Sequence, residues 1–273
     1  MNHGKVKVIV LRTAGTNCDA ETVFAFESCG AQAQAVHINQ LFDGRVRLKD
    51  WHILVIPGGF TYGDDIASGR ILANELRLRL GEDLCRFIGD GKLIIGICNG
   101  FQVMVKAGIL PGPLDSNEEK THDPIPIQKA TLINNDSGKF EDRWCHLKTA
   151  GNSVWTEGLG SVVYFPVAHA EGKFIPKDQD VLAKLRDNGQ IAFCYCSPNG
   201  EKPAYPENPN GSVDDIAGVT DKTGRVLGLM PHPERHFFFT QHPFWTRLPR
   251  NGPHGQGAKI FENGVQYVKK HLL

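Results

Sequence analysis

Residues 92–108 constrain the fold of this chain more than any other stretch. The apolar run over 92–97 predicts a buried strand, and 101–107 has the pattern of a helix. Between them the chain reads GICNG, and its two glycines allow a sharp turn from strand into helix. Such a turn places its central residue, Cys98, at the carboxyl end of a parallel strand.

Strands and helices alternate through the first 110 residues of the sequence. We expect strands at 6–11, 33–37, 52–56 and 92–97, and helices at 19–29, 66–80, 82–88 and 101–107. Alternation of this kind predicts an α/β fold with a mostly parallel central sheet and helices on both faces. In such folds, ligands bind at the carboxyl ends of the strands.

Beyond residue 110 the pattern becomes richer in strands. Short strand-like runs are expected near 127–133, 143–148, 161–167, 181–185, 190–196 and 225–230. An irregular extension follows at about 237–257, and an amphipathic helix closes the sequence. We interpret residues 1–273 as a single α/β domain with β-rich additions after residue 110.

Composition excludes several classes of protein. Thirty basic and thirty acidic residues cancel, which disfavours a nucleic acid or an anionic membrane as the main partner. The longest apolar runs fall short of the ~18 residues of a membrane span, and the first residues do not have the pattern of a signal peptide. Seven cysteines without regular spacing indicate a reduced, cytoplasmic protein.

Cys98 is the candidate nucleophile. As an isolated residue it would equally be a small buried side chain, because free cysteine is commonly buried. The turn, however, is expected to expose its side chain, and the start of a helix stabilises a thiolate. The backbone N–H of Asn99 would then point at an oxyanion that forms over Cys98.

His232 is the candidate base for this nucleophile. It lies in MPHPER, where two prolines favour an extended path, so that residues two apart point the same way and Glu234 lies alongside His232. A base and the group that orients it would then be adjacent. The alternatives are an ordinary surface turn or a metal site with His236. Since a third ligand at metal spacing is lacking, we expect no metal.

PGGF supplies a candidate second donor for the oxyanion. Its two glycines, Gly58 and Gly59, end the strand expected at 52–56 and let a backbone N–H approach a substrate. Paired glycines after a strand are more often a simple turn. The stretch RTAGTNCD over 12–19 lies at the same edge of the sheet, but it is not a phosphate-binding loop.

Together, GICNGFQ, MPHPER and PGGF resemble the class I, triad-type glutamine amidotransferases, whose fold is flavodoxin-like. More narrowly, RTAGTNCD, PGGFTYGDD, GICNGFQVM, AHAEG and YPENPNGSVDDIAGVT are similar to the glutaminase subunits of phosphoribosylformylglycinamidine synthase. These stretches run from about residue 6 to residue 236.

The resemblance implies a residue assignment. Cys98 would be the nucleophile, His232 the base and Glu234 its orienter, and the reaction would pass through a γ-glutamyl thioester. Substrate contacts would come from Gly58, Gly59, Asn99, Gln102, Ala168, His169, Ala170 and Glu171.

The resemblance also implies partners. Ammonia released from glutamine would pass to a separate synthetase subunit, which uses ATP and Mg²⁺ to convert formylglycinamide ribonucleotide to the amidine in purine synthesis. A small scaffold subunit often completes the complex. No cofactor is expected in this chain itself. Two alternatives stay open: a stand-alone γ-glutamyl hydrolase or peptidase of the same fold, and a non-enzymatic binding protein that would not need the His232–Glu234 pair.

Overall fold

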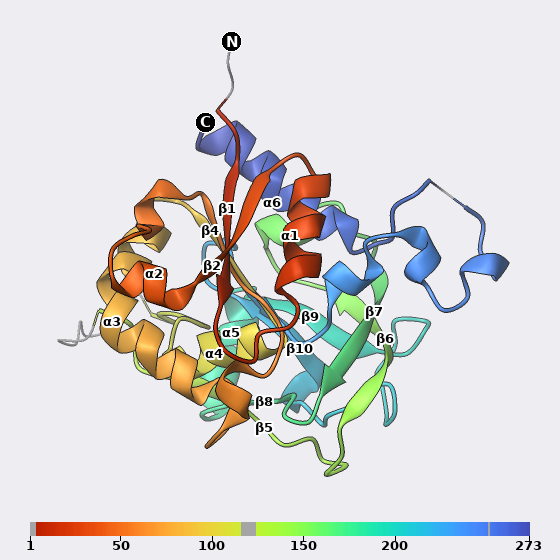
Figure 1. The fold of residues 1–273 in the computed structure, drawn as a ribbon. Helices are drawn as coiled ribbons and strands as arrows, with labels where there is room; N and C mark the ends of the chain where they lie inside the picture. The colour runs from red at the N-terminus through yellow and green to blue at the C-terminus, as the bar shows by residue number, and fades with distance from the viewer. Residues whose placement is uncertain (1–3, 116–123, 251) are drawn as a thin grey trace.

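The computed structural model describes residues 4–115, 124–250 and 252–273. In these residues one nine-stranded sheet forms the centre of the molecule, with the strand order β2-β1-β3-β4-β11-β10-β9-β6-β7 (Figure 1). The half from β2 to β11 is parallel, and the strands from β10 to β7 continue it in antiparallel pairing. The expected α/β fold is confirmed, and most strands of the β-rich additions extend the same sheet.

The strands fall into three groups. The parallel half consists of β1 (Lys7–Arg12), β2 (Gln32–His37), β3 (Ile53–Ile56), β4 (Leu93–Ile97) and β11 (Val226–Leu229). The antiparallel half consists of β6 (Glu141–Thr149), β7 (Val162–His169), β9 (Ile191–Cys196) and β10 (Ile216–Thr220). A separate two-stranded sheet pairs β5 (Ala130–Ile133) with β8 (Lys173–Pro176).

Helices pack against both sheets. They are α1 (Asp19–Ser28), α2 (Ile38–Phe42), α3 (Arg70–Gly89), α4 (Asn99–Ala107), α5 (Gln179–Asp187) and α6 (Ala258–His271). Helices α1 and α6 pack together through Phe26 and Phe261, whose ring centroids lie 5.1 Å apart, while α3 packs against α4 (Figure 1).

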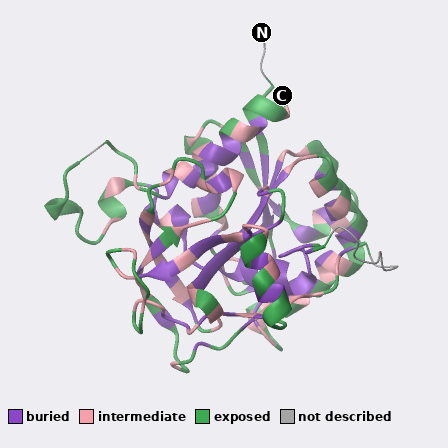
Figure 2. Ribbon diagram, turned by 180° about the vertical axis from the view of Figure 1, so that it is seen from behind, coloured by how far each residue is buried: buried purple, intermediate pink, exposed green. Residues whose placement is uncertain are grey.

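The central strands carry the hydrophobic core. Every residue of β3, β4 and β11 is buried, as expected for parallel strands that are covered on both faces (Figure 2). Because these strands are buried, the positions of the loops that follow them are fixed. Residues at the carboxyl ends of β3, β4 and β11 are therefore held on a rigid platform.

Several expectations for individual elements were wrong. The run at 181–185 is part of helix α5, whose side chains Val181, Leu182 and Leu185 face the core at helical spacing. Asp178 begins this helix by accepting a hydrogen bond from Val181 N at 2.9 Å. The helices expected at 66–80 and 82–88 are the single helix α3.

The segment 237–257 projects from the body of the molecule beside α6 (Figure 1). Its described residues form only short 3₁₀ turns, at Phe239–Gln241 and Trp245–Arg247, as expected for an irregular extension. Among the described residues, helices that are both long and apolar enough to cross a membrane are absent.

Candidate active site

Cys98 lies at the turn between β4 and α4, with φ 52° and ψ −106°. This conformation is rare for a residue other than glycine and is typical of strained positions at functional sites. Hydrogen bonds hold both sides of the turn, because Cys98 N donates to Leu229 O at 2.8 Å and Gln102 N donates to Cys98 O at 3.1 Å. The thiol donates to Ala168 O at 3.6 Å.

Close packing explains the glycines on either side of Cys98. A Cβ atom on Gly100 would lie 1.8 Å from Ile56 O, and one on Gly96 would lie 2.3 Å from Met104 Sδ. Larger residues would push α4 away from β3 and β4. One expectation was wrong: the turn does not expose the cysteine, which is only 5% accessible. The ends of β7 and β11 lie against it, through its hydrogen bonds with Ala168 and Leu229.

His232 and Glu234 follow β11 and form a buried pair. Nδ1 of His232 lies 2.6 Å from Oε1 of Glu234, and the two residues are 2% and 3% exposed. The expected extended path was wrong, because Pro233–His236 forms a 3₁₀ turn. The turn brings the two side chains together, and His232 N donates to Pro166 O of β7 at 2.8 Å.

The surroundings of His232 favour its protonated form. Burial by itself would lower the pKa of this imidazole, but the Glu234 carboxylate and Cys98 raise it well above its usual value. Within the described residues, Nε2 of His232 lacks a hydrogen-bond partner. The arrangement leaves one ring nitrogen oriented by Glu234 and the other free to exchange a proton.

Gly58 and Gly59 follow β3 beside this pair. A Cβ atom on Gly58 would lie 2.9 Å from Cε1 of His232, so only glycine lets the backbone approach the imidazole so closely. Gly58 O accepts from Cys18 N at 3.2 Å, and Phe60 N donates to Gly15 O at 2.9 Å. The loop after β1 therefore holds the paired glycines in place.

Asn99 opens α4, so its N–H is one of the donors that a helix leaves without an intrahelical acceptor. Its side chain secures the neighbouring loop. Oδ1 accepts from Oγ1 of Thr61 at 2.7 Å, and Nδ2 donates to Oε1 of Gln102 and to Oδ1 of Asp64, both at 3.0 Å. Asn99 thus joins the nucleophile turn to the loop that carries Gly59.

The residues 168–171 comprise the end of β7 and the two residues after it, and Ala168 lies against the turn at Cys98. Gln102 donates through Nε2 to Glu171 O, and Asn135 N donates to Ala170 O at 2.9 Å. Asn135 also accepts from Gly172 N at 2.9 Å and lies 3.1 Å from Nδ1 of His169. The side chain of His169 is held inside the protein, so this segment offers mainly its backbone to a ligand.

Lys106 and Asn135 are residues of this region that the sequence pattern did not indicate. Lys106 is buried on α4, where its Nζ donates to Ser68 O at 2.6 Å and lies 3.3 Å from Oε2 of Glu171. The Glu171 carboxylate also accepts from Ser68 N at 3.3 Å. A buried ion pair therefore connects α4, the segment before α3 and the segment after β7.

His236 does not join the His232 site. Its Nδ1 lies 2.8 Å from Tyr164 O, and its ring packs edge-on against Trp144. The residue contributes to packing between β6, β7 and the 3₁₀ turn.

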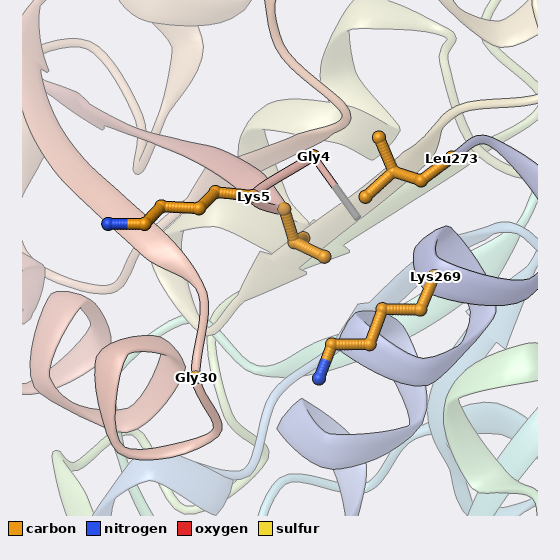
Figure 3. A pocket seen from close by; sticks show the side chains of 6 residues that line it. Gly4, Lys5, Gly30, Lys269 and Leu273 are labelled. Carbon is orange, nitrogen blue, oxygen red and sulfur yellow. The ribbon is translucent and has the colours of Figure 1, made fainter. Parts of the chain in front are cut away.

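A cavity lies at the opposite edge of the sheet, beside the chain termini (Figure 3). Gly4, Lys5, Val6, Gly30, Lys269 and Leu273 line it. These residues precede β1 and β2 or end α6, so the cavity is at the amino ends of the strands. Cys98 and His232 lie at the carboxyl ends, where α/β folds bind their ligands.

The strained cysteine, its neighbouring histidine–carboxylate pair and the two glycine-bearing turns define a triad-type amidotransferase. Comparison with protein families agrees: residues 5–268 match the model of the CobB/CobQ-like glutamine amidotransferase domain. The chain belongs to this family, and it is a glutamine amidotransferase.

Two curated relatives are similar over nearly their whole length. Both carry the name phosphoribosylformylglycinamidine synthase subunit PurQ. The one from Dehalococcoides mccartyi is 46% identical over 97% of this chain and 99% of its own. The one from Archaeoglobus fulgidus is 42% identical over 99% of this chain and 100% of its own.

A solved structure has the same fold. It is described as the structure of PurLQS from Thermotoga maritima; the matching chain is 27% identical with a TM-score of 0.71, over 97% of this chain and all of its own.

Proposed function

We propose that this chain is the glutaminase subunit of phosphoribosylformylglycinamidine synthase. The observation that carries the proposal is the strained Cys98 turn beside the buried His232–Glu234 pair, in a chain similar to PurQ subunits from end to end. The name of the relatives and the presence of PurLQS among the similar structures support a complex with a synthetase subunit and a small third subunit.

The geometry supports a thioester mechanism. The proton of the Cys98 thiol passes to His232 before the attack, Cys98 Sγ then attacks the side-chain amide carbon of glutamine, and the N–H groups of Gly59 and Asn99 stabilise the oxyanion. His232 then gives the proton to the leaving nitrogen, and ammonia departs. Water, deprotonated by the same imidazole, cleaves the thioester to release glutamate and restore the thiol.

The glutamine itself would bind between Gly58, Gln102 and the segment 168–171. Because the side chains of Gln102 and Glu171 already have partners within the protein, we propose that the backbone of this segment supplies most substrate contacts. In this proposal Ala168 and Ala170 place carbonyl and N–H groups, and His169 keeps the segment packed.

The remaining functions of the complex are assigned to its other subunits. The synthetase subunit would bind ATP and Mg²⁺ and use ammonia to convert formylglycinamide ribonucleotide to the amidine. We propose a cytoplasmic location and a single domain for this chain, with neither nucleic acid nor a membrane as partner.

The test measures glutamate release by the purified chain alone and with the synthetase and small subunits, together with amidine formation. Amidine formed from glutamine only when this chain is added supports the proposal. Full glutaminase activity without partners, with no amidine formed in the reconstituted mixture, would instead identify a stand-alone γ-glutamyl hydrolase.

A further inference from the structure

The loop between β9 and β10 reaches the segment proposed to bind glutamine, yet the proposed reaction gives this loop no role. Its residues 207–212 read ENPNGS, part of one of the stretches similar to the glutaminase subunits. The end of the loop is buried, since Asn210 is 0% exposed and Ser212 is 5% exposed. Polar side chains inside a protein are destabilising unless each has a partner, so the partners of these two residues indicate what the loop does.

Ser212 contacts the backbone just beyond the turn at 170–172. Its Oγ accepts a hydrogen bond from Phe174 N at 2.9 Å and lies 3.3 Å from Gly172 O. Phe174 is 0% exposed, so water cannot replace this oxygen. Without the Ser212 hydroxyl a buried N–H would lose its acceptor, which destabilises more than the bond itself stabilises. Residues 172–174 would then move to relieve the loss.

Asn210 fixes the direction of the Ser212 hydroxyl. Nδ2 of Asn210 donates to the Tyr195 hydroxyl at 3.0 Å, so that Oδ1 is turned to Ser212. This oxygen accepts from Ser212 N at 3.0 Å and from the Ser212 hydroxyl at 2.8 Å. Because an amide oxygen can only accept, the single hydroxyl hydrogen goes to Asn210, and the lone pairs of Oγ are left for Phe174 N. The two side chains therefore act as one unit.

An asparagine from another loop holds the near end of the same turn. Asn135 donates through Nδ2 to His169 O at 2.8 Å, and its Oδ1 accepts from Gly172 N at 2.9 Å. Ser212 holds the far end at Phe174. The turn is therefore fixed at both ends by buried side chains.

The turn itself keeps free donors. Among the described residues, the N–H groups of Ala170 and Glu171 lack an acceptor. The same segment reaches the nucleophile, since Ala168 O accepts from the Cys98 thiol at 3.6 Å. The anchoring of residues 172–174 therefore influences where these donors lie relative to Cys98.

We infer that Ser212 and Asn210 are positioning residues for glutamine binding: they hold the end of this turn, so that its free N–H groups keep the placement that the substrate needs. The inference rests on the proposed function, because it takes the segment 168–171 as the one that binds glutamine. Both residues form their hydrogen bonds away from Cys98 and His232. They therefore act on substrate binding and not on the chemical step.

The expected consequence is a split between the two steady-state constants. A contact made equally in the ground state and in the transition state changes KM and leaves kcat alone. In the complex with the synthetase and small subunits, Ser212→Ala should raise KM for glutamine at least ~10-fold and keep kcat within ~2-fold of the wild type. Synthesis from added ammonia should not change, because that reaction does not use this segment.

The matched control is Thr220→Val. Thr220 is also 0% exposed, and its hydroxyl also donates to a backbone oxygen, Val226 O at 2.9 Å. Val226 begins β11, so this bond lies at the end of the strand opposite to the candidate site. Thr220→Val should lose stability in urea unfolding as Ser212→Ala does, but keep the wild-type KM. A wild-type KM in Ser212→Ala, or an equal rise in Thr220→Val, would overturn the inference.

Amide hydrogen exchange of the chain supplies a readout that does not depend on activity. The Phe174 N–H should exchange at least ~10-fold faster in Ser212→Ala than in Thr220→Val. If Ser212→Ala does not fold, Ser212→Cys fills the same space with a weaker hydrogen-bonding group and decides the question. Equal exchange in the two variants would overturn the inference. A complex without glutaminase activity that still shows the faster exchange would refute the proposed function and leave the anchoring of the turn by Ser212 standing.

Discussion

The ammonium group of Lys106 lies 3.3 Å from Oε2 of Glu171, and its side chain is almost fully buried. Lys106 comes from the helix that begins at the nucleophile turn, and Glu171 comes from the segment proposed to bind glutamine. Burial lowers the pKa of Lys106, while the Glu171 carboxylate opposes that change. The pair therefore holds two sides of the candidate site in a fixed relation.

Lys106→Met should leave the Glu171 carboxylate without its cation and loosen the segment 168–171. Removing one partner of a buried pair costs about 3 kcal/mol. We expect a fall of that order in the free energy of unfolding and a raised KM for glutamine, measured by urea unfolding and steady-state glutaminase assays.

The matched control is Glu171→Gln, alone and combined with Lys106→Met. The double variant should be more stable than the sum of the single losses predicts, since neither charge is then left unpaired. Simple additivity would contradict a coupled pair.

His232→Ala should reduce glutaminase activity nearly as much as loss of Cys98, whereas Glu234→Gln should be milder. A glutamine at 234 still offers an oxygen to Nδ1 of His232 across the 2.6 Å contact, but without the charge that raises the pKa of the imidazole. Steady-state kcat values decide. Wild-type rates in His232→Ala would remove this residue from the reaction.

Much of this site could be predicted from the sequence, because its residues lie in short contiguous motifs. The glycines around Cys98 and the spacing of His232 and Glu234 are contiguous motifs, and strand ends place them at one edge of the sheet. The sequence predicted that His232 and Glu234 meet because the chain is extended there. That reason was wrong, since a 3₁₀ turn brings the two side chains together.

Contacts between distant segments were not predictable. Cys18 meets Arg235 across 217 positions, and Lys106 meets Glu171 across 65. No periodicity in the sequence records such pairs. Other errors come from short segments whose pattern fits more than one structure. The apolar residues of VLAKL fit a buried strand as well as a helix. Strand β10 (IAGVT) is too short and too rich in small residues to be recognised as a strand.

Cys98→Ser should abolish amidine synthesis from glutamine and leave synthesis from added ammonia intact. The residue is proposed only to release ammonia, and a serine hydroxyl is a poor nucleophile for a base that serves a thiol. Both activities are measured on one preparation of the complex. An equal fall in the ammonia-dependent reaction would mean that Cys98 supports assembly instead.

Protonation of His169 should lower the free energy of unfolding in mild acid. Burial lowers its pKa from 6.5 to about 4, so between these values the unfolded chain binds the proton more readily than the folded chain. The stability from a neutral His169 is thus complete above pH 6.5 and is lost as the pH falls toward 4.

The loss amounts to about 3 kcal/mol at 1.36 kcal/mol per pKa unit. Urea unfolding at pH 7 and pH 5 should show a smaller difference in His169→Gln than in the wild type. His271→Gln, at an exposed position in α6, is the control and should keep the wild-type difference. The same pH dependence in both variants would assign the acid sensitivity to other groups.

We expect the synthetase partner to control the glutaminase activity of this chain. Ammonia made without a synthetase wastes glutamine, so the isolated chain should be a slow glutaminase. The loop after Gly59 offers a physical route: Tyr62, Asp64 and Ile66 all have positive φ, and Ile66 is 89% exposed. Strain of this kind costs ~1–3 kcal/mol per residue and is common in segments that switch.

A partner that contacts Ile66 would bias this loop and, through Thr61 and Asn99, the donors of the oxyanion. We expect kcat in the complex with its nucleotide substrate to exceed that of the isolated chain by at least ~10-fold, about 1.4 kcal/mol. Ile66→Asp should weaken this activation without changing the rate of the isolated chain, because the side chain points into solvent. Equal rates for the isolated chain and the complex would show that the loop is preset, and they would favour the stand-alone hydrolase.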